Sequence, residues 1–220
     1  MAQVIDPEVV ASRVHEIRLD IGRLASHPVS LVAVTKTFPV EAWNIALSAG
    51  CDAVGENYAQ ELLEKVGQGP AGLPIHFVGA IQSNKVRALA PHVTLWHGVD
   101  RPSVVDEIGR RAPGAAVLLQ VNTTDEESKS GVSPAGLDAV LSRAIEAGLQ
   151  VRGLMTLGPT HGTEADIRAS FTQLRALADQ HHLVECSMGM SGDYRIALEC
   201  GATIIRIGSM LFGPRSSVGP

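Results

Sequence analysis

Val29-Ser-Leu-Val-Ala-Val-Thr-Lys36 is a run of mostly apolar, β-branched residues that leads directly into a lysine. Continuous apolar character without strict alternation is typical of a parallel strand that is buried on both faces. Side chains alternate along a strand, so Val32, Val34 and Lys36 share one face. The stretch therefore predicts an α/β fold with a parallel sheet, in which Lys36 lies at the end of a strand.

The same unit of a short strand followed by a helix repeats along the chain. A helix precedes the first strand, because Asp6-Pro7 is a typical helix start. Strands are expected at 29–36, 53–55, 75–78, 93–96, 116–121, 150–157, 184–187 and 203–207. Eight strands alternating with helical segments predict a single (β/α)8 barrel over residues 1–220, of the TIM type, with an extra N-terminal helix.

A doubly wound open sheet is the alternative architecture for alternating strands and helices. The first strand-to-helix turn, Thr35-Lys-Thr-Phe-Pro39, contains no G-x-G-x-x-G pattern. That fingerprint accompanies dinucleotide binding in open sheets, so its absence from the turn favours the barrel.

Composition and charge exclude several classes of function. Hydrophobic residues make up 45% of the chain and charged residues 19%, and the net charge of −5 comes without any basic run that would suit nucleic acid. We expect a cytoplasmic protein, since neither a signal peptide nor a membrane-spanning stretch is evident. Cys51, Cys186 and Cys200 lack the spacing of metal ligands, so we expect reduced cysteines and no metal site.

Lys36 is the first candidate functional residue. A lone ammonium at the mouth of a buried sheet is unfavourable unless it is paired or shifted toward its neutral amine. Pairing with a carboxylate such as Glu56 is one interpretation. The other is chemical, because a neutral lysine amine forms a Schiff base with an aldehyde. In a barrel, functional groups come from the carboxyl ends of the strands, so the residues at those ends bear on the choice.

Two small, glycine-bearing turns follow the last two predicted strands. They are Ser187-Met-Gly-Met-Ser191-Gly-Asp193 and Arg206-Ile-Gly208-Ser209. Backbone N–H groups and hydroxyls in such turns bind phosphate, and these two loops are the recurrent phosphate position of TIM-type barrels. Ordinary turn formation uses the same residue types.

Arg206 shares a strand face with Ile204 and Gly208 and should point into the barrel. A buried guanidinium needs an acceptor, which either Glu56 or the ring nitrogen of a bound heterocycle would supply. A lysine that captures an aldehyde, a phosphate-binding turn and a cation beside a ring nitrogen together indicate pyridoxal 5′-phosphate (PLP).

The chain also resembles a known family, the pyridoxal phosphate homeostasis proteins, over nearly its whole length. The motifs that carry the resemblance are Ala33-Val-Thr-Lys36-Thr, Gly55-Glu-Asn-Tyr-Ala-Gln-Glu61, His76-Phe-Val-Gly79, Ile81-Gln-Ser-Asn-Lys85, Leu119-Gln-Val-Asn122, Asp125-Glu-Glu-Ser-Lys-Ser-Gly131, Gly153-Leu-Met155, Ser187-Met-Gly-Met-Ser191, Arg206-Ile-Gly-Ser209 and Phe212-Gly. Departures from the family pattern are small: Ala59, Ala80 and Ser209, the last of which keeps a hydroxyl where threonine is usual.

The resemblance implies a single-domain barrel similar to the N-terminal domain of alanine racemase, with PLP held as a Schiff base on Lys36. It further implies that Ser191, Gly208 and Ser209 hold the phosphate, that Arg206 faces the pyridine nitrogen, and that Asn57 and Met155 line the ring site. The implied function is non-catalytic PLP binding in vitamin B6 homeostasis, by a monomer whose candidate recipients are apo forms of PLP-dependent enzymes.

Two enzyme hypotheses compete with a binding protein. A PLP-dependent amino-acid racemase, or another Schiff-base enzyme, would need an acid/base group on each face of the substrate carbon. Alanine racemases take one, a tyrosine, from a second domain that is not expected here, and Tyr58 and Tyr194 begin helices. A cofactor-free sugar-phosphate enzyme would use Glu56 as base.

Lys129 raises a separate hypothesis about release of the ligand. It lies in the loop that follows the predicted strand 116–121, at the same mouth as Lys36. A second amine there would assist exchange of a bound aldehyde. The alternative is a solvated loop in which Asp125, Glu126 and Glu127 offset the lysine charge.

Overall fold

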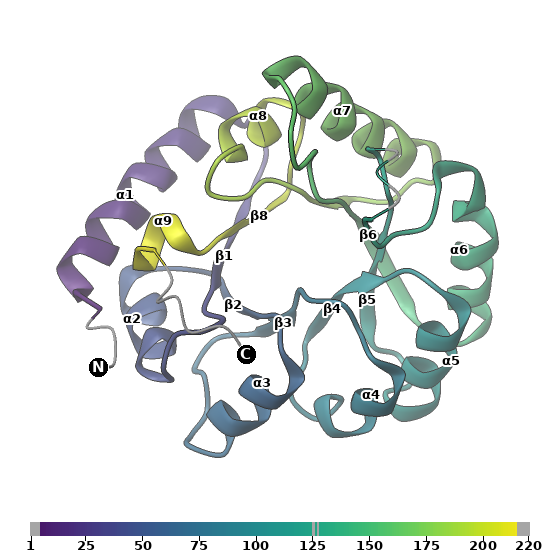
Figure 1. The fold of residues 1–220 in the computed structure, drawn as a ribbon, viewed down its shortest axis with the longest axis horizontal. Coiled ribbons are helices and arrows are strands. Elements are labelled where there is room, and N and C mark those ends of the chain that lie inside the picture. The colour runs from purple at the N-terminus through teal and green to yellow at the C-terminus, as the bar shows by residue number, and fades with distance from the viewer. Residues whose placement is uncertain (1–4, 125, 127, 215–220) are drawn as a thin grey trace.

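Parallel strands pair in sequence order from β1 to β8, and β8 pairs back with β1, so the sheet closes into a barrel surrounded by helices (Figure 1). The computed structural model describes residues 5–124, 126 and 128–214. The strands are β1 (Ser30–Val34), β2 (Ala53–Glu56), β3 (Ile75–Phe77), β4 (Leu95–Val99), β5 (Ala116–Gln120), β6 (Gln150–Met155), β7 (Glu185–Ser187) and β8 (Ile204–Ile207). The (β/α)8 prediction is confirmed, and closure leaves no unpaired sheet edge.

The helices form the outer layer of the barrel (Figure 1). They are α1 (Pro7–Leu24), α2 (Glu41–Ala49), α3 (Ala59–Val66), α4 (Ser83–Leu89), α5 (Pro102–Arg111), α6 (Leu137–Glu146), α7 (Glu164–Gln180), α8 (Tyr194–Glu199) and α9 (Ser209–Phe212), with a 3-10 turn, η1 (Pro134–Gly136), before α6. None of these described helices combines the length and apolar character that a membrane crossing requires.

The extra N-terminal helix is present as predicted. The Asp6 carboxylate accepts hydrogen bonds from the backbone N–H groups of Glu8 and Val9 at the start of α1. Val10, Val14 and Ile17 form its buried face, and the helix lies beside α2, α8 and α9 (Figure 1). It thus covers the region where the last strand meets the first.

Side-chain alternation divides the buried residues into two cores. The outer core lies between the strands and the helices, and Val54, Trp96 and Phe171 belong to it. The inner core fills the barrel itself and consists of Val32, Ala53, Leu95, Leu118, Met155 and Ile204. A residue two positions further along a strand keeps the same face, so the inner residues predict which side chains reach the mouth of the barrel.

β4 is the strand that the sequence misplaced. A strand was expected at 93–96, but β4 begins at Leu95 and continues to Val99. Thr94 instead donates from its N–H and its hydroxyl to the carbonyl of Ile75, each at 2.8 Å. His97 therefore lies within β4 and is fully buried, whereas the expected strand 93–96 would have ended just before it.

Candidate functional site

A cavity of about 580 Å³ opens at the carboxyl ends of the strands. All the candidate site residues line it: Lys36, Asn57, Met155, Ser191, Arg206, Gly208 and Ser209. These residues come from different strands and loops, and barrel closure brings them together. The rest of the lining is Val34, Phe38, Val78, Gly79, Ala80, Gln120, Ser128, Lys129, Ser130, Leu157, Met190 and Gly192.

Lys36 lies in the turn that follows β1 and is half-buried. Val32 belongs to the inner core, and Val34 and Lys36 both line the cavity above it. The period-two placement of these side chains is confirmed. The N–H of Thr35 continues the pairing with β2 by donating to the Gly55 carbonyl at 3.0 Å, so the lysine follows immediately on the barrel wall.

Glu56 does not share the cavity with Lys36. It is fully buried on the helix side of β2, and its Oε1 accepts from Lys65 Nζ at 2.7 Å, Thr35 Oγ1 at 2.5 Å and Trp43 Nε1 at 3.0 Å. Alternation explains this, because Glu56 shares its face with Val54 of the outer core. The interpretations of Glu56 as partner of Lys36, acceptor for Arg206 or catalytic base were therefore wrong.

The two glycine-bearing turns meet at one edge of the cavity. Ser209 Oγ donates to Ser191 Oγ at 3.2 Å, and the N–H of Met210 donates to the same Ser191 oxygen at 3.2 Å. Gly189 adopts φ +92°, and a Cβ there would lie 2.6 Å from Cβ of Ala197, so only glycine suits this position. The turns predicted to form a phosphate site thus lie next to each other.

Arg206 is buried and donates from Nη1 to Ser187 Oγ at 2.6 Å and from Nη2 to the Thr156 carbonyl at 2.9 Å. The Ser187 hydroxyl and the Thr156 carbonyl are thus the acceptors that the buried guanidinium requires. Burial lowers the pKa of Arg206 to about 10, and the charge of Asp193 opposes that shift. The guanidinium is therefore a cation at neutral pH, at the inner wall of the cavity.

A chain of hydrogen bonds continues from Arg206 into the barrel. His97 Nδ1 lies 2.9 Å from Ser187 Oγ, and His97 Nε2 lies 3.1 Å from His76 Nδ1. Burial lowers the pKa of His97 well below its usual range. Burial and the Arg152 charge lower that of His76 to about 4. Both imidazoles are consequently neutral at pH 7.

Asn57 offers an unused acceptor at the cavity. Its Oδ1 is buried and has no hydrogen-bond partner among the described residues. The backbone of Asn57 packs closely on Gly79, where a Cβ would lie 2.1 Å from the Asn57 carbonyl oxygen. A buried amide oxygen without a donor is unfavourable, so a ligand group that donates a hydrogen bond fits this position.

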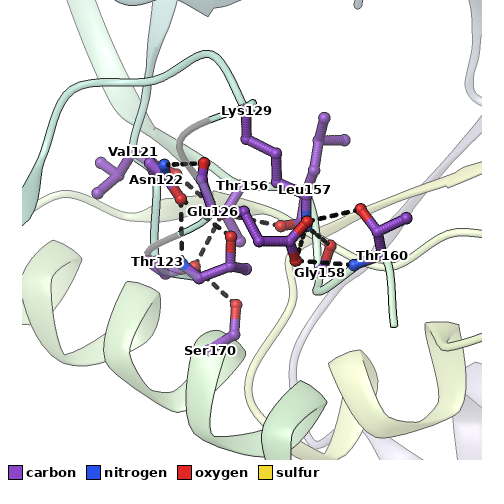
Figure 2. Close-up of polar contacts among 11 residues, drawn as sticks. Val121, Asn122, Thr123, Glu126, Lys129, Thr156, Leu157, Gly158, Thr160 and Ser170 are labelled. Atoms are coloured by element: carbon purple, nitrogen blue, oxygen red, sulfur yellow. Dashed lines mark hydrogen bonds and ion pairs between the residues drawn. The ribbon is translucent and has the colours of Figure 1, made fainter. Parts of the chain in front are cut away.

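The loop after β5 is fastened to the loop after β6 beside the cavity (Figure 2). Lys129 Nζ donates to Glu126 Oε1 at 2.9 Å and to the Gly158 carbonyl at 2.5 Å. Glu126 also accepts from the N–H of Thr160 at 2.9 Å and from its hydroxyl at 2.8 Å. The hydrogen bonds from Lys129 and Thr160 lower the pKa of Glu126 to about 2, so the Glu126 carboxylate that joins the two loops is ionised at neutral pH.

Glu126 offsets the charge of Lys129, as the charged-loop interpretation expected, but the lysine is not solvated as that interpretation had it. Its side chain is only 12% exposed, and it both lines the cavity and joins the two loops. Asp125 and Glu127, which were expected to offset its charge, lie outside the described residues. A role of the Lys129 amine in ligand exchange stays a prediction.

Some residues of the site were missed by sequence reasoning. Gln120 lines the cavity and donates from Nε2 to the Ser130 carbonyl at 2.7 Å. Alternation along the strand could have predicted this position, because Gln120 follows Leu118 of the inner core by two residues and so shares its face. The contact between His76 and His97 had no such signal, since it depends on the mutual rotation of two strands.

Comparison with known proteins shows which family the chain belongs to. Residues 13–216 match the family described as alanine racemase, N-terminal domain. The pyridoxal phosphate homeostasis protein of Pseudomonas aeruginosa is 40% identical over 221 residues, covering 96% of this chain and 95% of that protein. That of Aquifex aeolicus is 39% identical over 197 residues, covering 84% and 86%.

Solved structures agree with this placement. PipY of Synechococcus elongatus with PLP bound is 33% identical, with a TM-score of 0.77 over 93% of this chain and 100% of that one. Alanine racemase of Corynebacterium glutamicum is 17% identical, with a TM-score of 0.76 over 100% of this chain and 65% of that one, and this likeness shows the fold alone. The predicted resemblance is confirmed, and the chain belongs to the pyridoxal phosphate homeostasis protein family.

Proposed function

We propose that this protein binds PLP in the cavity at the barrel mouth and takes part in vitamin B6 homeostasis without catalysing a reaction. The observation that carries the proposal is the convergence of complementary groups on one cavity. The cavity is lined by the lysine, the two adjacent serines, the buried arginine and Asn57, whose buried amide oxygen has no hydrogen-bond partner among the described residues. The relative from Synechococcus elongatus, of the same fold, has a structure with PLP bound.

The residues present fit the chemical groups of PLP. Ser191, Gly208 and Ser209 would hold the phosphate, Arg206 would face the pyridine nitrogen, and Asn57 and Met155 would line the ring. When bound, PLP supplies an aldehyde that condenses with a lysine amine to a Schiff base, with loss of one water. Lys36 is the proposed lysine. The rest of the proposal is a cytoplasmic monomer that passes PLP to apo-enzymes.

Borohydride reduction of the protein loaded with PLP should leave a pyridoxyl group on Lys36. Hydride reduces the C=N bond to a stable secondary amine, so the attachment site survives proteolysis and can be read by mass spectrometry. Lys36 is expected because it lines the cavity together with the serine turns. An adduct found solely on Lys85 of α4 or on Lys129 would reject the assignment.

Replacing Ser191 and Ser209 together with alanine should weaken binding of PLP more than binding of pyridoxal. The lost hydrogen bonds would be to a charged phosphate, which are worth at most about 1.5 to 3 kcal/mol each. Equilibrium dialysis with both ligands measures the difference. Equal losses for PLP and pyridoxal would show that these turns do not hold phosphate.

An amino-acid racemase is the second candidate, favoured by the fold shared with alanine racemase. Neither tyrosine lines the cavity: Tyr58 is 53% exposed at the start of α3, and Tyr194 donates from its hydroxyl to Asp20 at 2.6 Å. The described residues thus place no tyrosine at a second face of a substrate.

We therefore expect no racemisation of L- or D-alanine above the background of a Lys36→Ala variant. Chiral chromatography of the amino acid after prolonged incubation with PLP-loaded protein measures this. Turnover that depends on Lys36 would move the protein to the enzyme class.

A further inference from the structure

Both neighbours of Lys36 are held by one group of charged side chains, of which Glu56 and Lys65 are buried and Glu61 is partly buried. On one side, the Thr35 carbonyl accepts from Lys65 Nζ at 2.7 Å, and the Thr35 hydroxyl donates to Glu56 Oε1 at 2.5 Å. On the other side, the N–H of Thr37 donates to Glu61 Oε1 at 2.6 Å. The turn that carries Lys36 is therefore tied down immediately before and immediately after the lysine.

Lys65 joins these contacts into one network. It is 3% exposed, and its ammonium contacts Glu56 Oε1 at 2.7 Å, Glu61 Oε1 at 2.8 Å and the Thr35 carbonyl at 2.7 Å. Lys65 donates hydrogen bonds to Glu56 Oε1 and to the Thr35 carbonyl, and it forms an ion pair with the Glu61 carboxylate. A cation bound in this way fixes the carboxylates that in turn hold the turn.

The turn itself is strained. Thr37 adopts φ +67°, in the left-handed region that β-branched residues rarely occupy. Such a conformation persists when the surrounding structure imposes it, and strained backbone gathers at ligand sites. The hydrogen bond from the N–H of Thr37 to Glu61 therefore stabilises the residue that has the unfavourable backbone conformation.

The network lies behind the cavity wall. The cavity lining includes Lys36 but not Glu56, Glu61 or Lys65, which are described residues of β2 and α3. These three side chains would accordingly not touch a bound ligand. An effect on ligand binding through them must pass through the turn at residues 35–37.

We propose that Lys65 is a positioning residue for Lys36: together with Glu56 and Glu61 it holds the strained turn so that the Lys36 amine faces the cavity. This inference rests on the proposed attachment of PLP to Lys36. It assigns α3 a part in ligand binding, because the helix supplies both Lys65 and Glu61. The competing explanation is that the buried ion pairs serve stability alone.

Two ligands separate positioning from stability. PLP has the aldehyde that reacts with Lys36, whereas pyridoxine 5′-phosphate carries an alcohol there and keeps the ring and phosphate. Glu61→Ala removes the acceptor of the Thr37 N–H and leaves the Lys65–Glu56 pair in place, so this variant should fold. We expect its PLP affinity to fall about tenfold, the equivalent of one hydrogen bond to a charged group, while its affinity for pyridoxine 5′-phosphate stays within about twofold of wild type.

Three further variants complete the comparison. Glu61→Gln keeps an acceptor for Thr37 and should retain most of the PLP affinity. Glu64→Ala is the matched control, since Glu64 lies on the exposed face of α3, and within the described part of the chain its carboxylate accepts a hydrogen bond from Gln60 alone, while Gln68 donates to its backbone carbonyl. Lys65→Met should lower PLP affinity at least as much as Glu61→Ala.

A measurement without ligand tests the network directly. Amide hydrogen exchange of the peptide that contains Thr37 should be faster in Glu61→Ala than in wild type and unchanged in Glu64→Ala. Equal exchange in all three proteins would overturn the inference whatever the ligand data show. So would equal losses of affinity for PLP and pyridoxine 5′-phosphate, which would indicate a purely structural role.

The outcomes also distinguish this inference from the proposed function. A borohydride adduct on Lys36 together with wild-type PLP affinity in Glu61→Ala would reject the positioning role alone. Absence of any adduct on Lys36 in wild-type protein would reject the proposed attachment, and the positioning role with it.

Discussion

Lys36→Ala should abolish the pyridoxyl adduct that borohydride leaves on the wild-type protein, while the barrel remains folded. The side chain contributes the proposed reacting amine, and it lines the cavity without belonging to either apolar core. Residual PLP binding should persist, because the variant keeps Ser191 and Ser209, the proposed phosphate-binding residues. Mass spectrometry of reduced protein and equilibrium dialysis measure the two effects separately.

Lys85→Ala is the control for this experiment. Lys85 lies in α4 and does not line the cavity, so its variant should form the adduct as wild type does. An adduct of undiminished yield in Lys36→Ala would contradict the proposed attachment and would direct attention to Lys129, the other lysine at the cavity.

Gly153→Ala should destabilise the barrel more than any other alanine substitution of a described glycine. A Cβ at this position in β6 would lie 1.9 Å from the backbone carbonyl oxygen of Glu185 in β7, where the two strands pair. Only movement of one strand relieves such a clash, so we expect a loss of about 3 kcal/mol or more in the free energy of unfolding. That corresponds to a decrease of roughly 6–12 °C in Tm for a chain of this size.

Gly22→Ala provides the comparison for thermal unfolding followed by circular dichroism. Gly22 lies inside α1, and its Cβ would meet no atom within 4 Å. Alanine has the higher helix propensity, so this variant should gain up to about 1 kcal/mol. A Tm for Gly153→Ala close to that of wild type would show that β6 and β7 can separate locally without loss of the fold.

The sequence predicted the parts of the site that depend on local periodicity. Val32, Val34 and Lys36 were placed on one face by alternation alone, and Arg206 was placed beside Ile204 in the same way. Closure of the barrel brings these residues together, because the carboxyl ends of all strands meet at one mouth. The proximity of Ser191 and Ser209 followed from that geometry.

The parts that failed depend on contacts between distant segments. Glu56 is the exception: alternation from Val54 places it on the outer face, and the predictions that it would pair with Lys36 or Arg206 were wrong. The sequence pattern does not predict the burial of Lys65, since a lysine in an amphipathic helix is ordinarily solvated. Its burial results from the close approach of α3 to β1 and β2, which no local pattern records.

A chain of polar contacts runs from Arg206 through Ser187 and His97 to His76. Arginine can only donate, so Ser187 Oγ accepts from Arg206, and the same oxygen contacts His97 Nδ1. His97 Nε2 in turn contacts His76 Nδ1.

The burial of the imidazole at the end of this chain, His76, has a consequence for the stability of the barrel in acid. His76 has a lowered pKa of about 4 in the folded protein, so between its usual pKa near 6.5 and 4 the unfolded chain takes up a proton that the folded chain refuses. Stability from this residue is hence present above pH 6.5 and decreases as the pH falls toward 4. At the other end, Arg206 keeps its charge up to about pH 10. His76 thus stays neutral and Arg206 stays charged through the whole neutral range. The barrel should begin to lose stability in mild acid, where the unfolded chain becomes protonated at His76.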